Sequence, residues 1–452
     1  MKRARQSMRR ITAEEAAELV RSGMWLDYGA TFSQPDVFDA ALAKRRNELH
    51  DVRIRACLTM RPRAVLEADP RGEAFHWVNL HFSGYDRKMH DMGRSNYLPV
   101  NLGEIPDYYR RFIDPVDIVI LKARPMDAEG NFNLSAATFW LRAMIERARI
   151  VIIEETTGIP HVVGEGVSVH KDEVDYVIAG DNAPAPELPN PLPSDVDKAV
   201  ARLITNEIED GACLQIGIGC MPNAVCSLLQ ESSARDLGIH TEMLTDGIID
   251  LYQAGRITGA RKQLNPGKLV CTFALGSTYL YEAIDRNPDI EFHAVDYTNL
   301  PQNIMLNDKV VAINNTTQID LTGQAASETD GHRHLTGTGG QAQFARGAYA
   351  SKGGKSFICL ASTFERRGER RSRIALGLTP GNTVTTTRAD MMYVVTEYGI
   401  ANLKGKCVAE RAQALIGLAH PDFRESLERE AYENGLIPRG FFGAAPQSVK
   451  AS

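Results

Sequence analysis

Residues 213–225 read CLQIGIGCMPNAV, and this stretch decides the fold class. Cys213–Ile216 is a short apolar run that is typical of a strand, and the glycines at 217 and 219 predict a loop after it. Pro222 then stands at a plausible first position of a helix. The stretch therefore predicts a strand, a glycine loop and a helix in direct succession.

A second helix is predicted upstream of this strand. Ser194 is a good N-cap with Asp197 three residues later, and Val200, Leu203 and Ile204 recur with helical spacing. The order helix, strand, glycine loop, helix indicates an open α/β sheet. In such sheets, ligands bind beyond the carboxyl ends of the strands.

The first part of the chain repeats this order. The strand candidate Trp25–Tyr28 is followed by a loop over residues 29–34, and Pro35 opens a helix predicted over residues 36–49. A proline-dense segment, typical of a semi-rigid linker, separates the two parts. We therefore predict two related open-sheet α/β domains, at residues 1–183 and 194–452, with the linker at 184–193. Further strands are predicted at residues 118–121, 150–153, 268–273, 310–313, 356–360 and 392–396.

Composition narrows the class of protein. The 452 residues are 43% hydrophobic and 24% charged, as in ordinary globular proteins, and the net charge of −6 argues against nucleic-acid and anionic-membrane partners. No apolar run approaches membrane-spanning length, and the basic start lacks the apolar segment of a signal peptide. The seven cysteines form no CxxC pair or Cys/His cluster. We expect a cytoplasmic protein without a metal site.

A single acidic residue marks the candidate chemistry. Residues 240–247 read HTEMLTDG, where Thr241–Leu244 is predicted as a strand and Asp246-Gly247 as a turn. Glu242 would thus lie near a strand end, and a second glycine cluster follows at residues 337–340. A carboxylate between two loops of free backbone N–H groups suits covalent acyl chemistry, because the carboxylate attacks and the amides hold the oxyanion.

The same residues also have plainer interpretations. Glu242 alone could be a surface glutamate, and His240 could polarise it or be structural. The Gly217–Asn223 loop is either a tight turn or an anion cradle, since its G-x-G-x-x-P pattern lacks the last glycine of the dinucleotide fingerprint. Lys355 and the arginines between residues 366 and 373 are either solvated or contact phosphates.

Taken together, the motifs resemble the acetyl-CoA hydrolase/transferase family. The nearest group is that of the 4-hydroxybutyrate and butyryl-CoA:acetate CoA-transferases. The matching motifs cover nearly the whole chain and are Phe82–Gly84, Pro125–Gly130, Gly217–Val225, His240–Gly247, Gly339–Ala348, Ser351–Ser356, Thr396–Ala401 and Ala419–Arg424.

The resemblance implies two domains of the CoA-transferase type with the active site between them, and Glu242 as the nucleophile. Gln343 departs locally from the family, because many members carry an acid after the GGQ motif. The residues that the resemblance assigns to CoA binding are Gly219, Cys220, Met221, Pro222, Asn223, Asn314, Gly339, Gly340 and Lys355.

The implied activity is a ping-pong transfer of CoA through a glutamyl-CoA thioester. Acyl-CoA and a small carboxylate are the substrates, no cofactor is tightly bound, and a homodimer is expected. An acyl-CoA hydrolase and a CoA-binding module without turnover stay open as alternatives. The acid could be acetate, butyrate, a hydroxybutyrate, or a dicarboxylate such as succinate or itaconate. Thr31, Met60 and the segment Trp77–Ser83 are hypothesised to line the acyl pocket.

Overall fold

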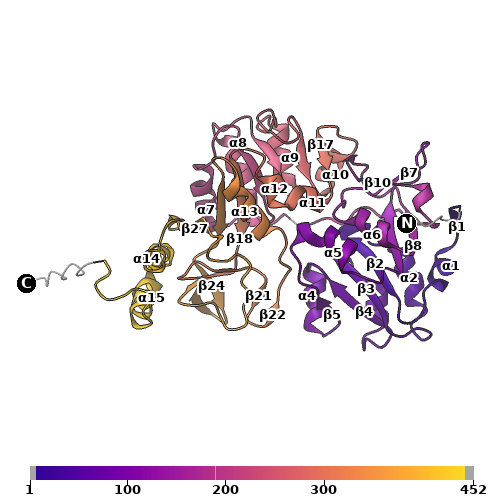
Figure 1. Cartoon of the computed structure of the whole chain (residues 1–452), viewed down its shortest axis with the longest axis horizontal. Coiled ribbons are helices and arrows are strands. Elements are labelled where there is room, and N and C mark those ends of the chain that lie inside the picture. The colour runs from indigo at the N-terminus through magenta and orange to yellow at the C-terminus, as the bar shows by residue number, and fades with distance from the viewer. Residues whose placement is uncertain (1–6, 189, 443–452) are drawn as a thin grey trace, which may run out of the picture.

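The computed structural model describes residues 7–188 and 190–442. The residues before the proline-dense segment 184–193 are called the N-terminal half here, and the residues after it are called the C-terminal half. Each half contains one large sheet flanked by helices, and the two halves lie against each other (Figure 1). The proline-dense segment between them contains no helix or strand within its described residues.

The N-terminal sheet is formed by eight strands of the described chain, all parallel. In spatial order they are β1 (Arg9–Arg10), β11 (Tyr176–Ala179), β8 (Ile150–Glu155), β6 (Ile118–Ala123), β2 (Trp25–Ala30), β3 (Val52–Cys57), β4 (Phe75–Asn79) and β5 (Ser95–Tyr97). The helices of this half are α1 (Ala13–Glu18), α2 (Val37–Ala43), α3 (Ala64–Ala68), α4 (Gly84–Asp91), α5 (Ile105–Arg111) and α6 (Leu141–Arg147).

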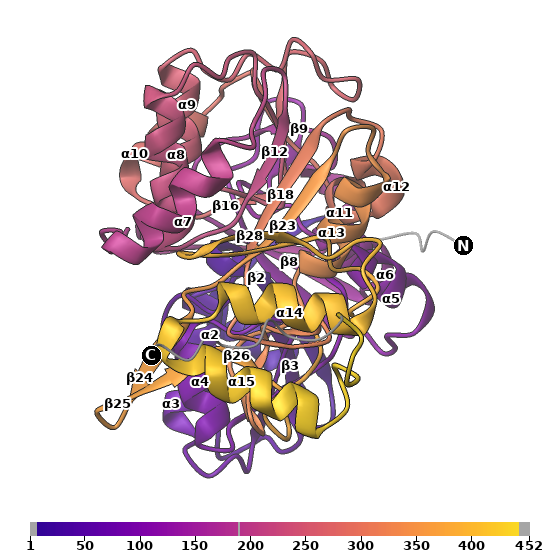
Figure 2. The ribbon, with the colours of Figure 1, turned by 90° about the vertical axis from the view of Figure 1, so that its left-hand side faces the viewer.

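The C-terminal sheet has nine strands within the described residues, parallel except for the edge strand β28. In spatial order they are β28 (Gly399–Asn402), β27 (Tyr393–Thr396), β23 (Lys355–Cys359), β18 (Val310–Asn315), β12 (Cys213–Ile216), β13 (Gly238–His240), β15 (Leu269–Cys271), β17 (Ile290–Phe292) and β9 (Val163–Gly164). Figure 2 shows β12, β18 and β23 side by side above the N-terminal half.

Helices and small sheets complete the C-terminal half. The helices are α7 (Asp195–Thr205), α8 (Cys220–Glu231), α9 (Asp246–Gln253), α10 (Thr278–Ile284), α11 (Val295–Asn299), α12 (Pro301–Ile304), α13 (Gln341–Ala350), α14 (Val408–Leu418) and α15 (Pro421–Glu433). The short strands here and in the N-terminal half are β7 (Asn131–Asn133), β10 (Ser168–His170), β14 (Met243–Leu244), β16 (Phe273–Ala274), β19 (Gln318–Asp320), β20 (Ala325–Ala326), β21 (Thr329–Asp330), β22 (Arg333–His334), β24 (Thr363–Arg366), β25 (Glu369–Ser372) and β26 (Ile374–Ala375).

The two large sheets share one strand order. The run β8-β6-β2-β3-β4-β5 of the first sheet corresponds to β23-β18-β12-β13-β15-β17 of the second, with β2 and β12 as the equivalent first strands. Each first strand leads through a loop into a helix, α2 or α8. This arrangement confirms the prediction of two parallel open α/β sheets.

One short strand links the halves in a way that the sequence did not predict. β9 belongs to the N-terminal half, yet it pairs in parallel with β17 at the edge of the C-terminal sheet. Gly164 pairs there with φ of 145°, and a Cβ atom at this position would run into the backbone of Phe292. Glycine is required at this point because only it allows so close a backbone approach.

The core is continuous across the two halves. Along β6, Ile118 and Ile120 pack into the outer core with α1, α2 and α3, whereas Val119 and Leu121 face the inner core. The inner core continues into the C-terminal half and includes Leu214 of β12. The alternation follows from the pleat of a strand that is buried on both faces.

The predictions for individual helices, strands and turns had different outcomes. Ser194 caps α7 as predicted, and Asp197 completes the capping box. The predicted turn at Asp246-Gly247 is wrong, because these residues begin α9 instead. The predicted strand Thr241–Leu244 is interrupted: β13 ends at His240, β14 begins at Met243, and Glu242 lies between them.

The strand order of the N-terminal sheet reverses between β2 and β6. This switch point, where open sheets often bind ligands, is occupied by a side chain of the protein itself. The carboxylate of Glu154 accepts hydrogen bonds from the backbone N–H groups of Asp36, Val37 and Phe38, at 3.0, 3.2 and 3.0 Å. These are the groups at the start of α2 that would otherwise attract an anionic ligand. Lys122 binds Asp36 beside them. The equivalent point of the C-terminal sheet borders a cavity.

Candidate active site

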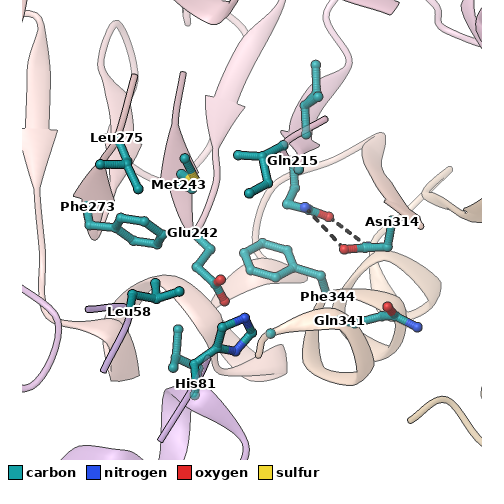
Figure 3. Close-up of a pocket in the computed structure, with 15 residues that line it drawn as sticks. Leu58, His81, Gln215, Glu242, Met243, Phe273, Leu275, Asn314, Gln341 and Phe344 are labelled. Carbon is teal, nitrogen blue, oxygen red and sulfur yellow. Dashed lines mark hydrogen bonds between the residues drawn. The ribbon is translucent and has the colours of Figure 1, made fainter. Parts of the chain in front are cut away.

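A cavity of about 150 Å³ lies at the carboxyl ends of β12 and β18, between the two halves of the chain (Figure 3). The C-terminal half contributes most of its lining, and the N-terminal half closes one side with Leu58, His81 and Leu102. This is the switch point of the C-terminal sheet, where open α/β sheets bind ligands. The lining residues of the C-terminal half are Gln215, Ile216, Gly217, Ile218, Glu242, Met243, Phe273, Leu275, Asn314, Gly340, Gln341 and Phe344.

Glu242 projects its carboxylate into this cavity (Figure 3). Its backbone carbonyl accepts hydrogen bonds from the amides of Thr272 and Phe273, at 3.1 and 3.3 Å. The amide of the preceding residue, Thr241, donates to Val270 at 2.9 Å. These hydrogen bonds fix the backbone of Glu242 at the interruption between β13 and β14, and the side chain of Glu242 points out of the sheet.

Two groups hold the carboxylate itself. The Asn299 side-chain amide donates to Glu242 Oε2 at 2.5 Å, and the backbone of Gly340 also hydrogen-bonds the carboxylate. Both bonds favour the ionised form, but burial opposes them and is the larger effect. The pKa of Glu242 is consequently raised to about 7. The site thus offers a carboxylate that is less well solvated than a surface glutamate, a property that suits a nucleophilic carboxylate.

Gly340 can lie this close to Glu242 and Asn299 only because it has no side chain. A Cβ atom there would overlap Glu242 Oε2 and lie 2.5 Å from Asn299 Nδ2. The glycine loop is also held by the N-terminal half, because the Leu102 amide donates to the Gly339 carbonyl at 3.1 Å. Nearby, the Gly103 amide donates to Gln343 Oε1 at 2.9 Å. The amide oxygen of Gln343 thus serves as the acceptor at this position.

Sequence reasoning missed Asn299, since nothing in the run Asp296–Pro301 distinguishes it from an ordinary loop asparagine. In the structure it ends α11, and its own orientation is fixed by Thr298, whose hydroxyl donates to Asn299 Oδ1 at 2.8 Å. His240 Nε2 bonds the Thr298 carbonyl at 2.8 Å. Burial lowers the pKa of His240 to about 3, so the ring is neutral and donates here. His240 therefore supports Glu242 through Thr298 and Asn299.

The structure separates the residues that the resemblance assigns to CoA. Asn314 and Gly340 line the cavity, and Asn314 Nδ2 donates to Gln215 Oε1 at 3.0 Å. Gly219 and Asn223 line an adjoining cavity together with Leu188 and Asn190, which flank the one residue of the linker that is not described.

The others lie further away. Cys220, Met221 and Pro222 form the first turn of α8, and Gly339 adjoins His81. Lys355 stands at the amino-terminal end of β23, at the opposite edge of the sheet from the cavity. Its ammonium group pairs there with Glu207 at 2.9 Å.

The hypothesised acyl-pocket segments are only partly at the cavity. His81, from the segment Trp77–Ser83, lines it, and so does Leu58, which the sequence did not single out; Thr31 and Met60 do not. The arginines between residues 366 and 373 belong to or follow the hairpin β24–β25, where Arg366 and Arg370 pair with Asp330 and Asp422 at 3.7 and 3.6 Å.

Two further findings concern the described residues only. They include no group of three or more His, Cys, Asp and Glu side chains that could hold a metal ion. None of the helices traced over residues 7–188 and 190–442 is long and apolar enough to cross a membrane.

Comparison with known proteins agrees with this geometry. Residues 1–189 match the model of the acetyl-CoA hydrolase/transferase N-terminal domain, and residues 276–431 match that of the C-terminal domain. The chain is 44% identical to the butyryl-CoA:acetate CoA-transferase of Anaerostipes caccae, covering 93% of this chain and 95% of that protein. It is 37% identical to the 4-hydroxybutyrate coenzyme A transferase of Clostridium kluyveri, covering 93% and 96%.

A solved structure shows the same fold. The crystal structure of RipA from Yersinia pestis matches with a TM-score of 0.87 at 36% sequence identity, covering 95% of this chain and 98% of that one. The chain therefore belongs to the acetyl-CoA hydrolase/transferase family. Within that family it is a CoA-transferase.

Proposed function

We propose that this enzyme moves CoA between a short-chain acyl-CoA and a free carboxylate such as acetate, butyrate or 4-hydroxybutyrate, with Glu242 as the covalent nucleophile. The observation that carries the proposal is the carboxylate of Glu242, which faces a cavity between the halves with Asn299 and Gly340 bonded to it. The names of the Anaerostipes and Clostridium relatives, which specify butyryl-CoA, acetate and 4-hydroxybutyrate, support the range of acids.

The first half-reaction consists of two exchanges. Ionised Glu242 attacks the thioester carbonyl, and the C–S bond breaks. The CoA thiolate is released, and an acyl-glutamyl anhydride is formed on the enzyme. The thiolate then attacks the glutamyl carbonyl, giving a glutamyl-CoA thioester and releasing the first acid as its carboxylate. A second carboxylate reverses both exchanges and takes the CoA away. No net proton is taken up, and one thioester replaces another.

The surrounding groups have separate roles in this sequence. The Asn299 amide and the Gly340 backbone lie beside the carboxylate, where they would stabilise the oxyanions formed during the exchanges. The loop Gly219–Asn223, Asn314 and the region of Gly339 and Gly340 are proposed to contact CoA. Lys355 has no part in this proposal, because it is paired at the other edge of the sheet. The apolar walls would keep water from the anhydride and so favour transfer over hydrolysis.

The test is to mix purified protein with butyryl-CoA, with and without acetate, and to follow every CoA species by mass spectrometry. Acetyl-CoA that forms only with acetate, with little free CoA, would support the proposal. Free CoA that accumulates regardless of acetate would replace it by the hydrolase alternative. No product from any short-chain donor would favour the binding module.

Replacing the nucleophile gives the matching control. We expect Glu242→Ala to abolish transfer while acyl-CoA still binds, because the variant removes the attacking atom and leaves the cavity walls in place. Binding is measured by calorimetry and turnover by the same mass-spectrometric assay. Turnover retained by this variant would refute the nucleophile assignment. Glu242→Gln is less suitable, because slow deamidation can restore the carboxylate.

We further propose a cytoplasmic homodimer that works without a tightly bound cofactor, as the family resemblance implies. Light scattering of the purified protein would give the oligomeric state, and mass spectrometry of the protein under native conditions would show any retained cofactor.

A further inference from the structure

The carboxylate of Glu242 depends on a loop that has no regular structure of its own. Residues 336–340, named here the 336–340 loop, lie between the hairpin β21–β22 and α13, and no helix or strand is assigned to them. The loop ends at Gly340, whose backbone bonds the Glu242 carboxylate. Because an irregular loop lacks internal hydrogen bonds, its position depends on the groups that surround it.

Much of that support comes from the N-terminal half. His81 Nε2 lies 2.6 Å from the hydroxyl oxygen of Thr336 and bonds it, and the Thr338 amide donates to the Tyr97 hydroxyl at 2.9 Å. The amide of Leu102 adds the bond to the loop described above. The N-terminal half therefore holds the loop at three points before it reaches the nucleophile.

The loop also lies directly against the His81 ring. A Cβ atom at Gly337 would lie 2.8 Å from His81 Nδ1 and 2.7 Å from the Leu80 carbonyl oxygen. A Cβ atom at Gly339 would lie 3.4 Å from His81 Cε1. Glycine is required at residue 337 because a side chain there would push the loop away from the ring.

The backbone of His81 is itself fixed by the N-terminal sheet. The strand β4 ends before His81, but the pairing with the segment after β3 continues. The Leu80 amide donates to the Ala56 carbonyl at 3.0 Å, and the Leu58 amide donates to the His81 carbonyl at 2.9 Å. Figure 3 shows the His81 ring pointing toward the Glu242 carboxylate, and both side chains line the same cavity.

His81 is neutral in this position. Burial, together with the charges of His334 and Arg87, lowers the pKa of His81 to about 4. Its Nδ1 atom is buried and has no hydrogen-bond partner among the described residues, so a protonated ring would bury an N–H group without an acceptor. The contribution of His81 near neutral pH must therefore come from its geometry and not from a charge or a proton.

We propose that His81 is a positioning residue for the proposed nucleophile. Its bond to Thr336 keeps the 336–340 loop where Gly340 can bond Glu242 and stabilise the oxyanions of the two exchanges. This inference rests on the proposed function, and it gives the N-terminal half a part in the reaction beyond closing the cavity.

The experiment removes either end of the bond between His81 and Thr336. His81→Phe keeps an aromatic ring without the nitrogen, and Thr336→Val keeps the shape without the hydroxyl. We expect each variant to lower kcat for transfer from butyryl-CoA to acetate about tenfold with little change in KM, because the contact to the oxyanion is weakened and substrate binding is not. The double variant should lose no more than either single variant. Additive losses, or an unchanged kcat in either single variant, would overturn the proposal.

The matched control is His90→Phe. His90 belongs to the same half of the chain, and its Nδ1 atom bonds the Ser95 carbonyl at 2.8 Å within that half. We expect this variant to keep the wild-type kcat. A loss as large as that of His81→Phe would show that any histidine of this region matters equally, which contradicts the assigned role.

Two further readouts separate positioning from a general loss of packing. His81→Gln can place its amide nitrogen near the position of Nε2 and should keep most of the activity, whereas His81→Asn is too short and should behave like His81→Phe. The Gly340 bond favours ionised Glu242, so His81→Phe should also move the acidic limb of the pH profile to higher pH. Equal losses in the Gln and Asn variants, or a fall in kcat without a shift of the limb, would overturn the proposal.

Hydrogen exchange followed by mass spectrometry tests the loop without turnover. We expect residues 336–340 to exchange at least about threefold faster in His81→Phe than in the wild type, and at the wild-type rate in His90→Phe. If His81→Phe does not fold, Thr336→Val carries the same expectation. An unchanged exchange rate in the folded variant would overturn the proposal. Failure of the wild type to transfer CoA would refute the proposed function, whereas the exchange result would still decide whether His81 holds the loop.

Discussion

At the scale of single residues, the protonation of Glu242, the proposed nucleophile, should set the pH range of the enzyme. Its pKa is raised to about 7, chiefly by burial, and only the ionised form can attack a thioester. The ionised fraction, and with it kcat/KM, should therefore fall about tenfold for each pH unit below 7. A pH profile from 5.5 to 8.5 measures this limb. An activity that stays flat down to pH 5.5 would contradict the raised pKa.

Asn299 favours the charged form of Glu242 and should also stabilise the oxyanions. We expect Asn299→Ala to lower kcat by about 100-fold, as loss of one oxyanion donor does in other enzymes, and to move the acidic limb of the pH profile to higher pH. Asn303→Ala, a neighbouring asparagine that bonds the Tyr297 carbonyl at 3.0 Å, is the control. A loss of kcat without a shift of the limb would show that Asn299 does not act on the charge of Glu242.

Gly340 tests the packing around the nucleophile. A methyl group at this position would overlap Glu242 Oε2, so Gly340→Ala should reduce kcat/KM by about 100-fold while the thermal midpoint of unfolding changes little. Gly377→Ala is the matched control, because a Cβ atom there meets no other atom within 4 Å. If the two alanine variants were equally active, the close contact between Gly340 and Glu242 would be refuted.

Residues differ in how well the sequence reveals them. Glu242 could be predicted because it stands in a motif between two glycine clusters, and the structure places it in the cavity. Asn299 and Leu58 could not, because their importance comes from contacts between distant segments rather than from their neighbours in sequence. Lys355 is the opposite case. Its glycine-rich motif suggested a contact with CoA, but the residue lies at the amino-terminal end of β23, away from the cavity.

At the scale of elements, local signals predicted the long strands and the capped helices. The Ser194 capping box and the apolar run of β12 act within a few residues and suffice to specify α7 and its following strand. The two-residue strand β9 has no such signal, because its pairing with β17 depends on tertiary contacts. The predicted turn at Asp246-Gly247 failed because Thr245 and Asp246 begin a helix whose buried face, Ile248, Ile249 and Leu251, outweighs the local turn preference.

The pairing of β9 can be tested through its glycine. Gly164→Ala would bring a Cβ atom into the backbone of Phe292 at a positive φ, so we expect a loss of about 1–3 kcal/mol in the free energy of unfolding and a fall in transfer activity. Glu165→Ala, one residue further on and exposed, is the control. Urea unfolding measures both. Equal stability of the two variants would refute the tight pairing.

At the scale of the whole molecule, the two halves share one strand order but differ in what lies at the point where that order reverses. The N-terminal switch point is bound to the carboxylate of Glu154, whereas the C-terminal one borders the cavity with Glu242. The sequence predicted two related domains but could not show this division, because it depends on where a distant glutamate places its side chain. The N-terminal half thus serves as a wall of the site, through Leu58, His81 and Leu102.

The strand β9 has a consequence for how substrates reach Glu242. A wide hinge motion about the proline-dense linker would have to pull β9 away from β17 and break an edge of the C-terminal sheet. It would also open the core that the two halves share. We therefore expect acyl-CoA entry and acid exchange to proceed with the halves joined, through local movements of the loops around the cavity. Under the proposed mechanism, the glutamyl-CoA intermediate would then stay enclosed while one acid leaves and the next arrives.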